Sequence, residues 1–481
     1  MMKRRLLSVL LAAMLAQPLS VRADLPDLGE ISDASLSPSD EARIGRDALR
    51  AMREAGDVLD DAEINAYLNS IGGRLAAAAA VPGVHFTYFC VGDTGINAFA
   101  MPGGYVGVNI GLILATQNEG ELAAVLGHET AHVAQRHIAR MQAANSATSP
   151  LLLLGTIVAA ALAAKAGSGE GAMGAVSAGM GLSISRQLAF SRDFEREADR
   201  VGMQYMAAAG FDVRYMSSFF QRLEQAGRYS DTMAYAFLRT HPVTLERISE
   251  AQNRSLDYPV RMRADSVDYL LVREKLRVLT MTPEEAVSYY DSTLARGLYL
   301  NEGAHWYGLA RAKLARHDRV GAAEALAKAR AKLPDDAMLY GLDVEIARDG
   351  RDWAAAARAA RAGLAAFPRN AALQLARIDV ALDSDDRKEA QALLRQLLND
   401  RQDDPALYRR EARLYADADP LRYHAALGNA FYYEQRYSSA LEQYQLAGKA
   451  KGDDFYLRSM LEARLREVER LAKDERKAAR N

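Results

Sequence analysis

The sequence has a single cysteine, Cys90, among its 481 residues. One cysteine cannot form a disulfide within the chain, and it cannot supply a zinc site built from several cysteine ligands. An excess of charge of one sign is also lacking, because 60 basic residues face 62 acidic ones. A nearly neutral chain gives no electrostatic reason to expect nucleic acid as a partner. These absences favour an ordinary globular protein, and its length is enough for about three domains.

Apolar runs long enough to span a bilayer are lacking too, since a spanning helix needs about 20 apolar residues. The longest apolar run near the start is Leu6–Ala16, which follows the cations of Lys3-Arg4-Arg5. Small residues then stand at both recognition positions of Val21-Arg22-Ala23. A basic start, a short apolar run and an A-x-A-like site are typical of a secretory signal peptide. The sequence therefore predicts a signal peptide over residues 1–23 and export, to the periplasm if the source is a Gram-negative bacterium. The alternative is a membrane anchor.

A second uncharged stretch lies in the middle of the chain. Leu151–Ala164 holds 14 residues without a charge, and a segment rich in glycine, alanine, serine and methionine follows it. The run is shorter than a spanning helix requires. Two interpretations stay open for residues 150–185, namely a buried helix with a glycine-rich loop, or a segment that contacts a membrane or gates substrate.

The hydrophobic periodicity predicts a mixed fold in the first half of the chain. The composition of residues 24–45 predicts a loosely structured N-terminal segment. Apolar residues at helical spacing predict helices over 41–80, 119–141 and 186–208. Alternation predicts a strand over 84–91, and Pro102-Gly103-Gly104 predicts a turn between strands 97–101 and 105–109. We expect this hairpin to lie beside the site, with Asn97, Ala98, Phe99, Ala100 and Met101 as an edge that binds substrate by strand addition. The alternative is a purely structural hairpin.

The chemistry begins with His128-Glu129-Thr130-Ala131-His132, an H-E-x-x-H pattern. Residues four apart lie on one face of a helix, so both imidazoles can reach one zinc ion. Glu129 follows the first histidine, and we predict that it is the general base that activates the attacking water. The predicted cofactor is one zinc ion per chain.

A catalytic zinc needs a third protein ligand. Glu195 and Asp199 are also four residues apart and share one face of a predicted helix. We predict that Glu195 binds zinc and that Asp199 accepts the ring N–H of a ligand histidine, which fixes its tautomer. Glu197 is predicted to point elsewhere. His137 lies five residues after His132, and we predict that this offset turns it away from the ligand face.

His241 stands before Pro242, which forces an extended backbone at the residue preceding it. A loop can therefore bring this imidazole over the open zinc position. Two functional roles stay open: stabilising the oxyanion of the tetrahedral intermediate, or occupying the fourth zinc position and repressing the enzyme. The alternative is a packed or capping histidine.

The second half of the chain repeats with a period of 34 residues, the spacing between Pro334 and Pro368. Small residues and tyrosines recur in each unit, as in Tyr307-Gly308-Leu309-Ala310 and Leu427-Gly428-Asn429-Ala430. This is the period of tetratricopeptide repeats, whose helix pairs stack into a solenoid. A generic helical bundle is the alternative.

Taken together, four segments resemble the family of HtpX-like and CAAX-prenyl-protease-type metallopeptidases. They are Asn97-Ala98-Phe99-Ala100 with Gly103-Gly104, then His128–His132, then Glu195–Asp199, and then Thr240-His241-Pro242. The resemblance runs from about residue 40 to 255. It implies a gluzincin fold with zinc on His128, His132 and Glu195, and a role in outer-membrane protein quality control. The integral-membrane members have spanning helices that this sequence lacks.

The predicted architecture is therefore α+β: a mostly helical gluzincin metallopeptidase domain with a small β-sheet, followed by an all-α tetratricopeptide-repeat solenoid. The predicted segments are a signal peptide (1–23), the metallopeptidase domain (24–265), a helical connector (266–300), the repeats (301–456), and a capping helix with its tail (457–481). The expected function is an exported zinc endopeptidase that cleaves misfolded or stalled envelope proteins. The repeats are expected to recruit these clients or the outer-membrane β-barrel assembly machinery. The alternative is a chaperone-like scaffold with a repressed protease domain.

Overall fold

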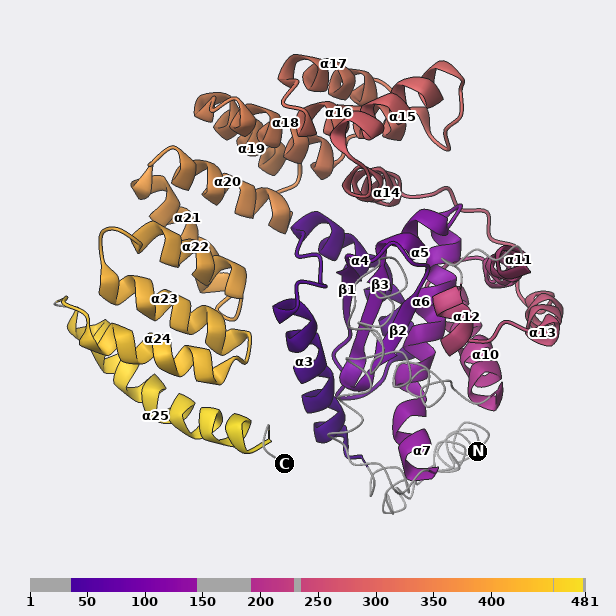
Figure 1. The fold of residues 1–481 in the computed structure, drawn as a ribbon, viewed down its shortest axis with the longest axis horizontal. Helices are drawn as coiled ribbons and strands as arrows, with labels where there is room; N and C mark the ends of the chain where they lie inside the picture. Colours follow the sequence, from indigo (N-terminus) through magenta and orange to yellow (C-terminus); the bar gives the residue numbers. More distant parts are fainter. Residues whose placement is uncertain (1–35, 145–191, 229–234, 453, 479–481) are drawn as a thin grey trace, which may run out of the picture.

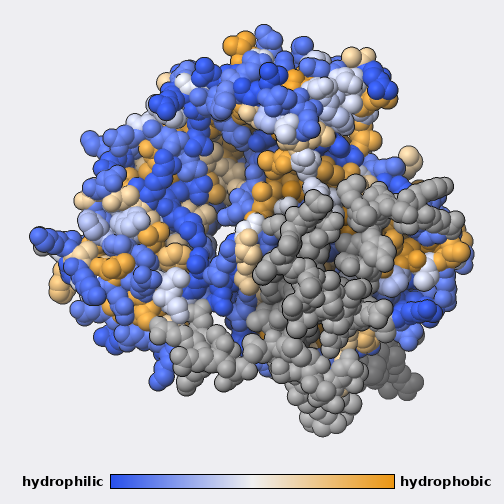
Figure 2. All heavy atoms as spheres, in the orientation of Figure 1, coloured by the Kyte–Doolittle hydropathy of each residue, from blue (hydrophilic) through white to orange (hydrophobic). Residues whose placement is uncertain are grey.

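The computed structural model describes residues 36–144, 192–228, 235–452 and 454–478 (Figure 1). The predicted signal peptide and the segment 150–185 lie outside these ranges. No helix within the described residues is both long enough and apolar enough to span a membrane. Hydrophilic residues cover much of the visible face of the C-terminal helices, with hydrophobic residues scattered between them (Figure 2).

A three-stranded sheet lies in the first half of the chain, with strands β1 (Thr87–Val91), β2 (Ala98–Met101) and β3 (Tyr105–Asn109) in the order β1-β3-β2. β1 runs parallel to β3, and β2 runs antiparallel to it. The turn between β2 and β3 is a short 3-10 segment, η1 (Pro102–Gly104). Gly103 and Gly104 have φ of 77° and 96°, a conformation that favours glycine. The Pro-Gly-Gly turn thus gives the predicted hairpin, and the strand predicted over 84–91 is shorter and begins at Thr87.

Helices surround this sheet to form what we call the body, α3 to α13. They are α3 (Pro38–Glu54), α4 (Ala62–Ala79), α5 (Ile110–Ala115), α6 (Glu119–Ala134), α7 (His137–Ala144), α10 (Arg192–Ala208), α11 (Arg214–Arg228), α12 (Tyr235–Thr240) and α13 (Leu245–Ser255). The apolar stripe expected in 41–80 lies in α4, where Ile64, Leu68 and Leu75 are fully buried. α4 packs on β1 and on α6, and α10 packs along α6. The core therefore sits around α6, the helix with the H-E-x-x-H pattern.

Two helices that the periodicity predicted as continuous are broken. The segment 41–80 divides into α3 and α4, because Val58 pairs with Val91 at the edge of the sheet and Asp61 caps the start of α4. The segment 119–141 divides into α6 and α7 at Arg136, whose φ is +51°. The loosely structured segment predicted for residues 24–45 also ends earlier than predicted, since α3 begins at Pro38 with Ser37 as its N-cap.

The remaining helices form what we call the arc, α14 to α25, which curves around the body in Figure 1. They are α14 (Val267–Leu279), α15 (Pro283–Ala295), α16 (Glu302–Ala315), α17 (Arg319–Arg330), α18 (Ala337–Asp349), α19 (Trp353–Ala366), α20 (Ala371–Asp383), α21 (Arg387–Asp400), α22 (Pro405–Tyr415), α23 (Pro420–Tyr433), α24 (Tyr437–Lys449) and α25 (Phe455–Ala478). Successive helices pack on one another. The assignment of these helices to tetratricopeptide repeats stays a prediction.

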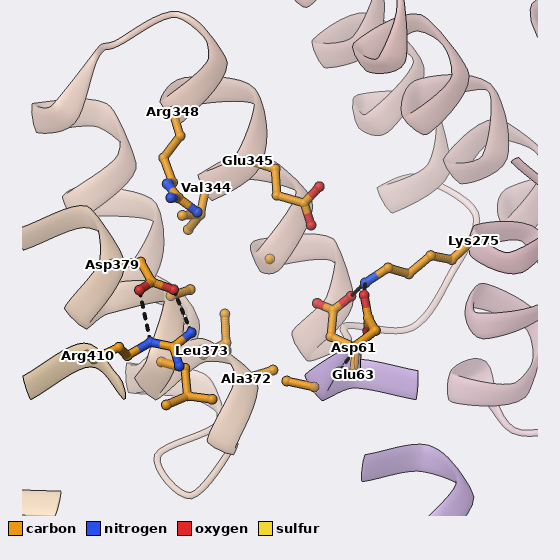
Figure 3. Close-up of a pocket in the computed structure, with 14 residues that line it drawn as sticks. Asp61, Glu63, Lys275, Val344, Glu345, Arg348, Ala372, Leu373, Asp379 and Arg410 are labelled. Carbon is orange, nitrogen blue, oxygen red and sulfur yellow. Dashed lines mark hydrogen bonds and ion pairs between the residues drawn. The ribbon is translucent and has the colours of Figure 1, made fainter. Parts of the chain in front are cut away.

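Polar contacts join the arc to the body near its end and near its start. Near its end, Arg436 pairs with Glu54 of α3 at 3.1 Å, and Arg50 donates to the carbonyl of Gln435. Near its start, Lys275 of α14 lies 2.6 Å from both Asp61 and Glu63 at the N-terminus of α4 (Figure 3). One hydrophobic cluster also runs from body residues such as Leu126 to arc residues such as Leu342. The body and the first helices of the arc therefore share a core.

Candidate metal centre

The site begins on α6, whose first turn is capped by the side chain of Asn118 accepting from the Glu121 N–H. His128 and His132 lie one turn apart on this helix, and each is 1% exposed. Their Nε2 atoms are 3.0 Å apart. The spacing predicted from the sequence thus brings both imidazoles to one point inside the body.

α10 crosses α6 closely because glycine faces glycine. A Cβ on Gly202 would lie 3.0 Å from the His128 backbone nitrogen and 3.1 Å from the Gly127 carbonyl. Two helices without side chains at the crossing can approach nearer than larger residues allow. This approach places Glu195, two turns before Gly202, against both histidines. Its carboxylate oxygens lie 3.5 Å from His128 Nε2 and 3.3 Å from His132 Nε2.

His241 adds a fourth nitrogen from the segment after α12. Its backbone N–H donates to the Phe237 carbonyl at 2.8 Å, which holds the residue at the end of that helix. Its Nδ1 lies 3.3 Å from His128 Nε2 and 3.0 Å from Glu195 Oε1. The ligand atoms of these four buried residues all lie within 4.8 Å of one another.

The donor set fits a tetrahedral zinc ion. Bonds of 2.0–2.1 Å to a tetrahedral zinc would put neighbouring donor atoms about 3.4 Å apart. Five contacts among His128, His132, Glu195 and His241 range from 3.0 to 3.5 Å, and one ligand atom from each residue lies within 4.8 Å of the others. Three imidazoles and one carboxylate are also a ligand chemistry that zinc accepts.

Glu129 lies beside this donor set with an unusual environment. Its side chain is fully buried, yet neither carboxylate oxygen has a hydrogen-bond partner within the described residues. A buried carboxylate without partners is costly unless a ligand or water serves it. The titratable group that faces it is His241, whose Nε2 lies 3.5 Å from Glu129 Oε1. His241 thus has one ring nitrogen toward the donor set and the other toward Glu129.

Asp199 occupies the position predicted for a carboxylate behind a histidine, since its Oδ1 lies 2.9 Å from His128 Nδ1. Arg247 of α13 holds Asp199 in turn, with Nε and Nη2 donating to the two carboxylate oxygens at 2.7 and 2.8 Å. Its Nη1 donates to the Pro242 carbonyl and lies 2.7 Å from Glu195 Oε2. One guanidinium therefore connects α10 with the segment that carries His241.

Sequence reasoning missed Arg247. The signal that could have found it is its place in the first turn of α13, next to the N-cap Thr244. A cation in the first turn of a helix is unfavourable beside the positive end of the helix dipole. The position of Arg247 therefore suggests a partner outside its own helix.

The buried charges shift one another's pKa. Burial opposes the ionised carboxylates, but His241, His128 and His132 hold the pKa of Glu195 well below its usual range. Burial also opposes the ionised form of Asp199, but Arg247 holds the pKa of Asp199 below its usual value. Burial would lower the pKa of His128, but the carboxylates of Asp199 and Glu195 raise it to about 10. The metal-free site therefore holds a proton that a bound cation must displace.

His137 lies outside the group of four possible metal ligands, as predicted, but it packs against His132. His137 is fully buried, and its Nδ1 lies 2.9 Å from Nδ1 of His132. The prediction assumed an unbroken helix, whereas the left-handed backbone of Arg136 ends α6 and turns His137 back toward it. Glu197 lies behind His137, 3.3 Å from its Nε2, and also pairs with Arg140. Burial lowers the pKa of His137 to about 4, so the ring is neutral at neutral pH.

The edge predicted to bind substrate, Asn97–Met101, corresponds to β2 and the residue before it. Asn109 donates its N–H to the carbonyl of Asn97, so these two residues form a hydrogen-bonded pair of the ladder. Because such pairs alternate in antiparallel strands, the backbone groups of Ala98 and Ala100 face away from β3. Within the described residues no strand pairs with this side. The carbonyl of Ile96 on the same side accepts from the Phe237 N–H of α12.

Comparison with known proteins identifies the region that holds this site. Residues 62–255 match the model of peptidase family M48. The chain is 38% identical over 256 residues to the putative beta-barrel assembly-enhancing protease of Vibrio cholerae, covering 53% of this chain and 52% of the relative. It is 32% identical over 279 residues to the beta-barrel assembly-enhancing protease of Escherichia coli strain K12, covering 57% of each.

A more distant group of relatives is mitochondrial. The chain is 31% identical over 216 residues to the mitochondrial metalloendopeptidase OMA1 of Schizosaccharomyces pombe, covering 44% of this chain and 60% of the relative. The chain spans about half the length of the bacterial relatives named above. What these comparisons have in common is a metallopeptidase domain, and peptidases of family M48 use zinc.

Proposed function

We propose that this chain, which carries a peptidase family M48 domain over residues 62–255, is an exported zinc-dependent endopeptidase of the bacterial envelope. The observation that carries the proposal is the convergence of His128, His132, Glu195 and His241 beside the buried, unpartnered Glu129. In this proposal His128, His132 and Glu195 hold the zinc. A bound zinc ion supplies Lewis-acid polarisation of the scissile carbonyl.

The chain's own residues provide the remaining steps. Glu129 accepts the proton of the attacking water and later passes it to the leaving amine. Asp199, held by Arg247, fixes the ring of His128, so that Nδ1 carries its hydrogen and Nε2 stays available. The burial of these groups excludes bulk water, which strengthens each electrostatic contact.

Glu129 also provides the test of this function. Glu129→Gln removes the base but no ligand, so the purified variant should retain zinc and lose casein cleavage. A wild-type protein without zinc, or a fully active Glu129→Gln variant, would reject the proposal.

For His241 we propose the repressing role. Its Nδ1 shares the donor set with the three other ligands, and its Nε2 faces the proposed base, Glu129. In that position the ring competes with substrate for the fourth zinc position. His241→Ala should therefore raise the cleavage rate of a short unfolded peptide. A lower rate would favour the oxyanion role instead, and an unchanged rate with unchanged zinc affinity would dismiss both.

The edge of β2 is proposed to hold the substrate. The outward backbone groups of Ala100, which is partly exposed, offer a donor and an acceptor to an extended peptide, whereas Ala98 is buried. Pairing through the main chain demands little of the substrate's sequence, which suits a protease that acts on misfolded proteins. A photoreactive crosslinker at position 100 should capture casein in the Glu129→Gln background, because Ala100 is partly exposed whereas Ala98 is buried. The same crosslinker at exposed Val320 of α17 serves as the control.

The clients are proposed to be unfolded or misassembled envelope proteins, recruited by the helices of 301–456. The names of the bacterial relatives, which are beta-barrel assembly-enhancing proteases, support a role in outer-membrane protein assembly. A periplasmic location after removal of residues 1–23 belongs to the same proposal, as does a contact of the arc with the β-barrel assembly machinery. A second candidate is a chaperone-like scaffold whose protease stays repressed. The position of His241 is the observation that favours it.

A further inference from the structure

His137 and Glu197 lie outside the four-residue donor set, yet they reach it through His132. His137 Nδ1 is 2.9 Å from His132 Nδ1, and His137 Nε2 is 3.3 Å from Glu197 Oε2. The three residues come from three helices, since α6 carries His132, α7 begins with His137, and α10 carries Glu197. The contact therefore joins the end of α6 to α10 on the side of His132 opposite the donor set.

The direction of both hydrogen bonds follows from the position of His132. Its Nε2 lies among the donor atoms, 3.0 Å from His128 Nε2 and 3.3 Å from Glu195 Oε1. An imidazole nitrogen that binds a metal carries no hydrogen, so the hydrogen of His132 is on Nδ1. That nitrogen must donate to His137 Nδ1, which leaves the hydrogen of His137 on Nε2. His137 then donates to the carboxylate of Glu197.

The ring of His137 is also fixed in orientation. Phe194 stacks on it with 4.6 Å between centroids and 15° between planes. The guanidinium of Arg140 lies over the ring of Phe194, 4.7 Å from its centroid, and donates to Glu197 at 2.9 Å. A ring held by stacking, with both nitrogens hydrogen-bonded, has one orientation and one tautomer.

We infer that His137 and Glu197 are positioning residues that fix the tautomer and ring plane of His132 for zinc, an inference that rests on the proposed zinc peptidase. They do for His132 what Asp199 and Arg247 do for His128. Each histidine ligand of α6 is thus supported by its own carboxylate, directly for His128 and through a second imidazole for His132. Neither His137 nor Glu197 contacts substrate in this role.

Zinc affinity of the full-length protein, measured by competition with a chromophoric chelator at neutral pH, tests the inference. His137→Leu removes the acceptor and the donor, and loss of such a partner lowers metal affinity about 10-fold to 100-fold. His137→Gln keeps a carbonyl acceptor and an N–H donor, so its affinity should return to within a few-fold of wild type. His305→Gln alters another buried histidine, in α16, and should leave zinc affinity unchanged.

A second variant keeps the test decisive if His137→Leu does not fold. Glu197→Ala leaves both imidazoles in place and changes a partly exposed side chain of α10, and it should lower zinc affinity about 10-fold. Its melting temperature without zinc should stay near that of wild type, which separates positioning from general stability. Unchanged zinc affinity in Glu197→Ala, or equal losses in His137→Leu and His137→Gln, would overturn the inference. A wild-type chain that binds no zinc would instead overturn the proposed function.

Discussion

The two glutamates of α10 that lie near the site face different partners. Glu195 contacts both α6 histidines of the donor set, His128 and His132, whereas Glu197 pairs with His137 and Arg140. Replacing Glu195 should therefore lower zinc affinity more than replacing Glu197. Glu195→Ala removes a proposed ligand and leaves Arg247 without one of its two carboxylates, so zinc affinity should fall by several orders of magnitude.

Chelator competition on both variants checks this difference, with Glu197→Ala as the matched control two residues away. We expect a loss of only about 10-fold in the control, since it disturbs the orientation of one ligand. Equal losses, or a larger loss for Glu197→Ala, would reject Glu195 as the ligand.

Residue spacing predicted the parts of the site that lie within unbroken helices. His128 and His132 on α6 are four residues apart, as are Glu195 and Asp199 on α10, and local geometry alone places each pair on one face. The same reasoning could not place His137 against His132, because the positive φ of Arg136 reverses the chain between the two helices. It could not place Arg247 either, since that residue reaches Asp199 through tertiary packing of α13. The breaks in 41–80 and 119–141 could not be predicted from the hydrophobic periodicity, because no proline interrupts either segment.

At the level of elements, the crossing of α6 and α10 depends on Gly202. An added Cβ would meet backbone atoms of His128 and Gly127 at 3.0–3.1 Å, and backbone atoms in a helix cannot move aside cheaply. Gly202→Ala should therefore push α10 away from α6, lower the stability by about 1–3 kcal/mol, and weaken zinc binding. Thermal melts and chelator competition measure the two effects.

Gly73→Ala in α4 is the matched control, and its effect on stability should have the opposite sign. Its added Cβ meets nothing within 4 Å, and the residue is exposed in a helix interior. Replacing such a glycine should stabilise the protein by about 0.5–1 kcal/mol. The idea of a tight crossing would be wrong if Gly202→Ala behaved like this control.

Within the arc, the contact of α18 with α14 brings two acids together. Asp336 caps α18 by accepting from the Met338 N–H at 2.8 Å, and it is only 8% exposed. Burial, together with the nearby Asp268, raises the pKa of Asp336 from 3.8 to about 7. A raised folded-state pKa means that the folded chain holds a proton that the unfolded chain has lost between about pH 4 and 7. This group therefore makes the protein less stable as pH rises through that window.

Asp336→Asn should remove that dependence, because asparagine keeps the capping oxygen without a charge. The melting temperature of the variant should be close to that of wild type at pH 4 and higher than wild type at pH 8. A difference that is the same at both pH values would show that Asp336 is not protonated in the folded arc.

At the scale of the whole molecule, the arc meets the body around a small cavity of about 150 Å³ (Figure 3). On one side, Lys275 of α14 reaches Asp61 and Glu63 at the start of α4. On the other, Arg410 of α22 pairs with Asp379 of α20 at 2.7 Å. The seam is thus lined by paired charges rather than by apolar side chains alone. Since α4 packs directly against α6, the seam lies one helix away from the candidate metal centre.

Lys275 should therefore contribute more to stability than a surface cation does. It is 5% exposed, and burial raises the pKa of its partner Glu63 even with the ammonium present. Lys275→Met would leave two carboxylates facing each other in the seam, which should lower the stability by about 2–4 kcal/mol, given that Asp61 retains some contact with solvent. Arg316→Met, which breaks an exposed pair with Glu284, should lower the stability by less than about 1 kcal/mol.

Because a protonated Glu63 needs no counter-ion, the loss of stability in Lys275→Met should be smaller at pH 5 than at pH 8. Denaturant unfolding of both variants at the two pH values measures this, and a loss equal to that of the control at pH 8 would show that the seam does not depend on Lys275.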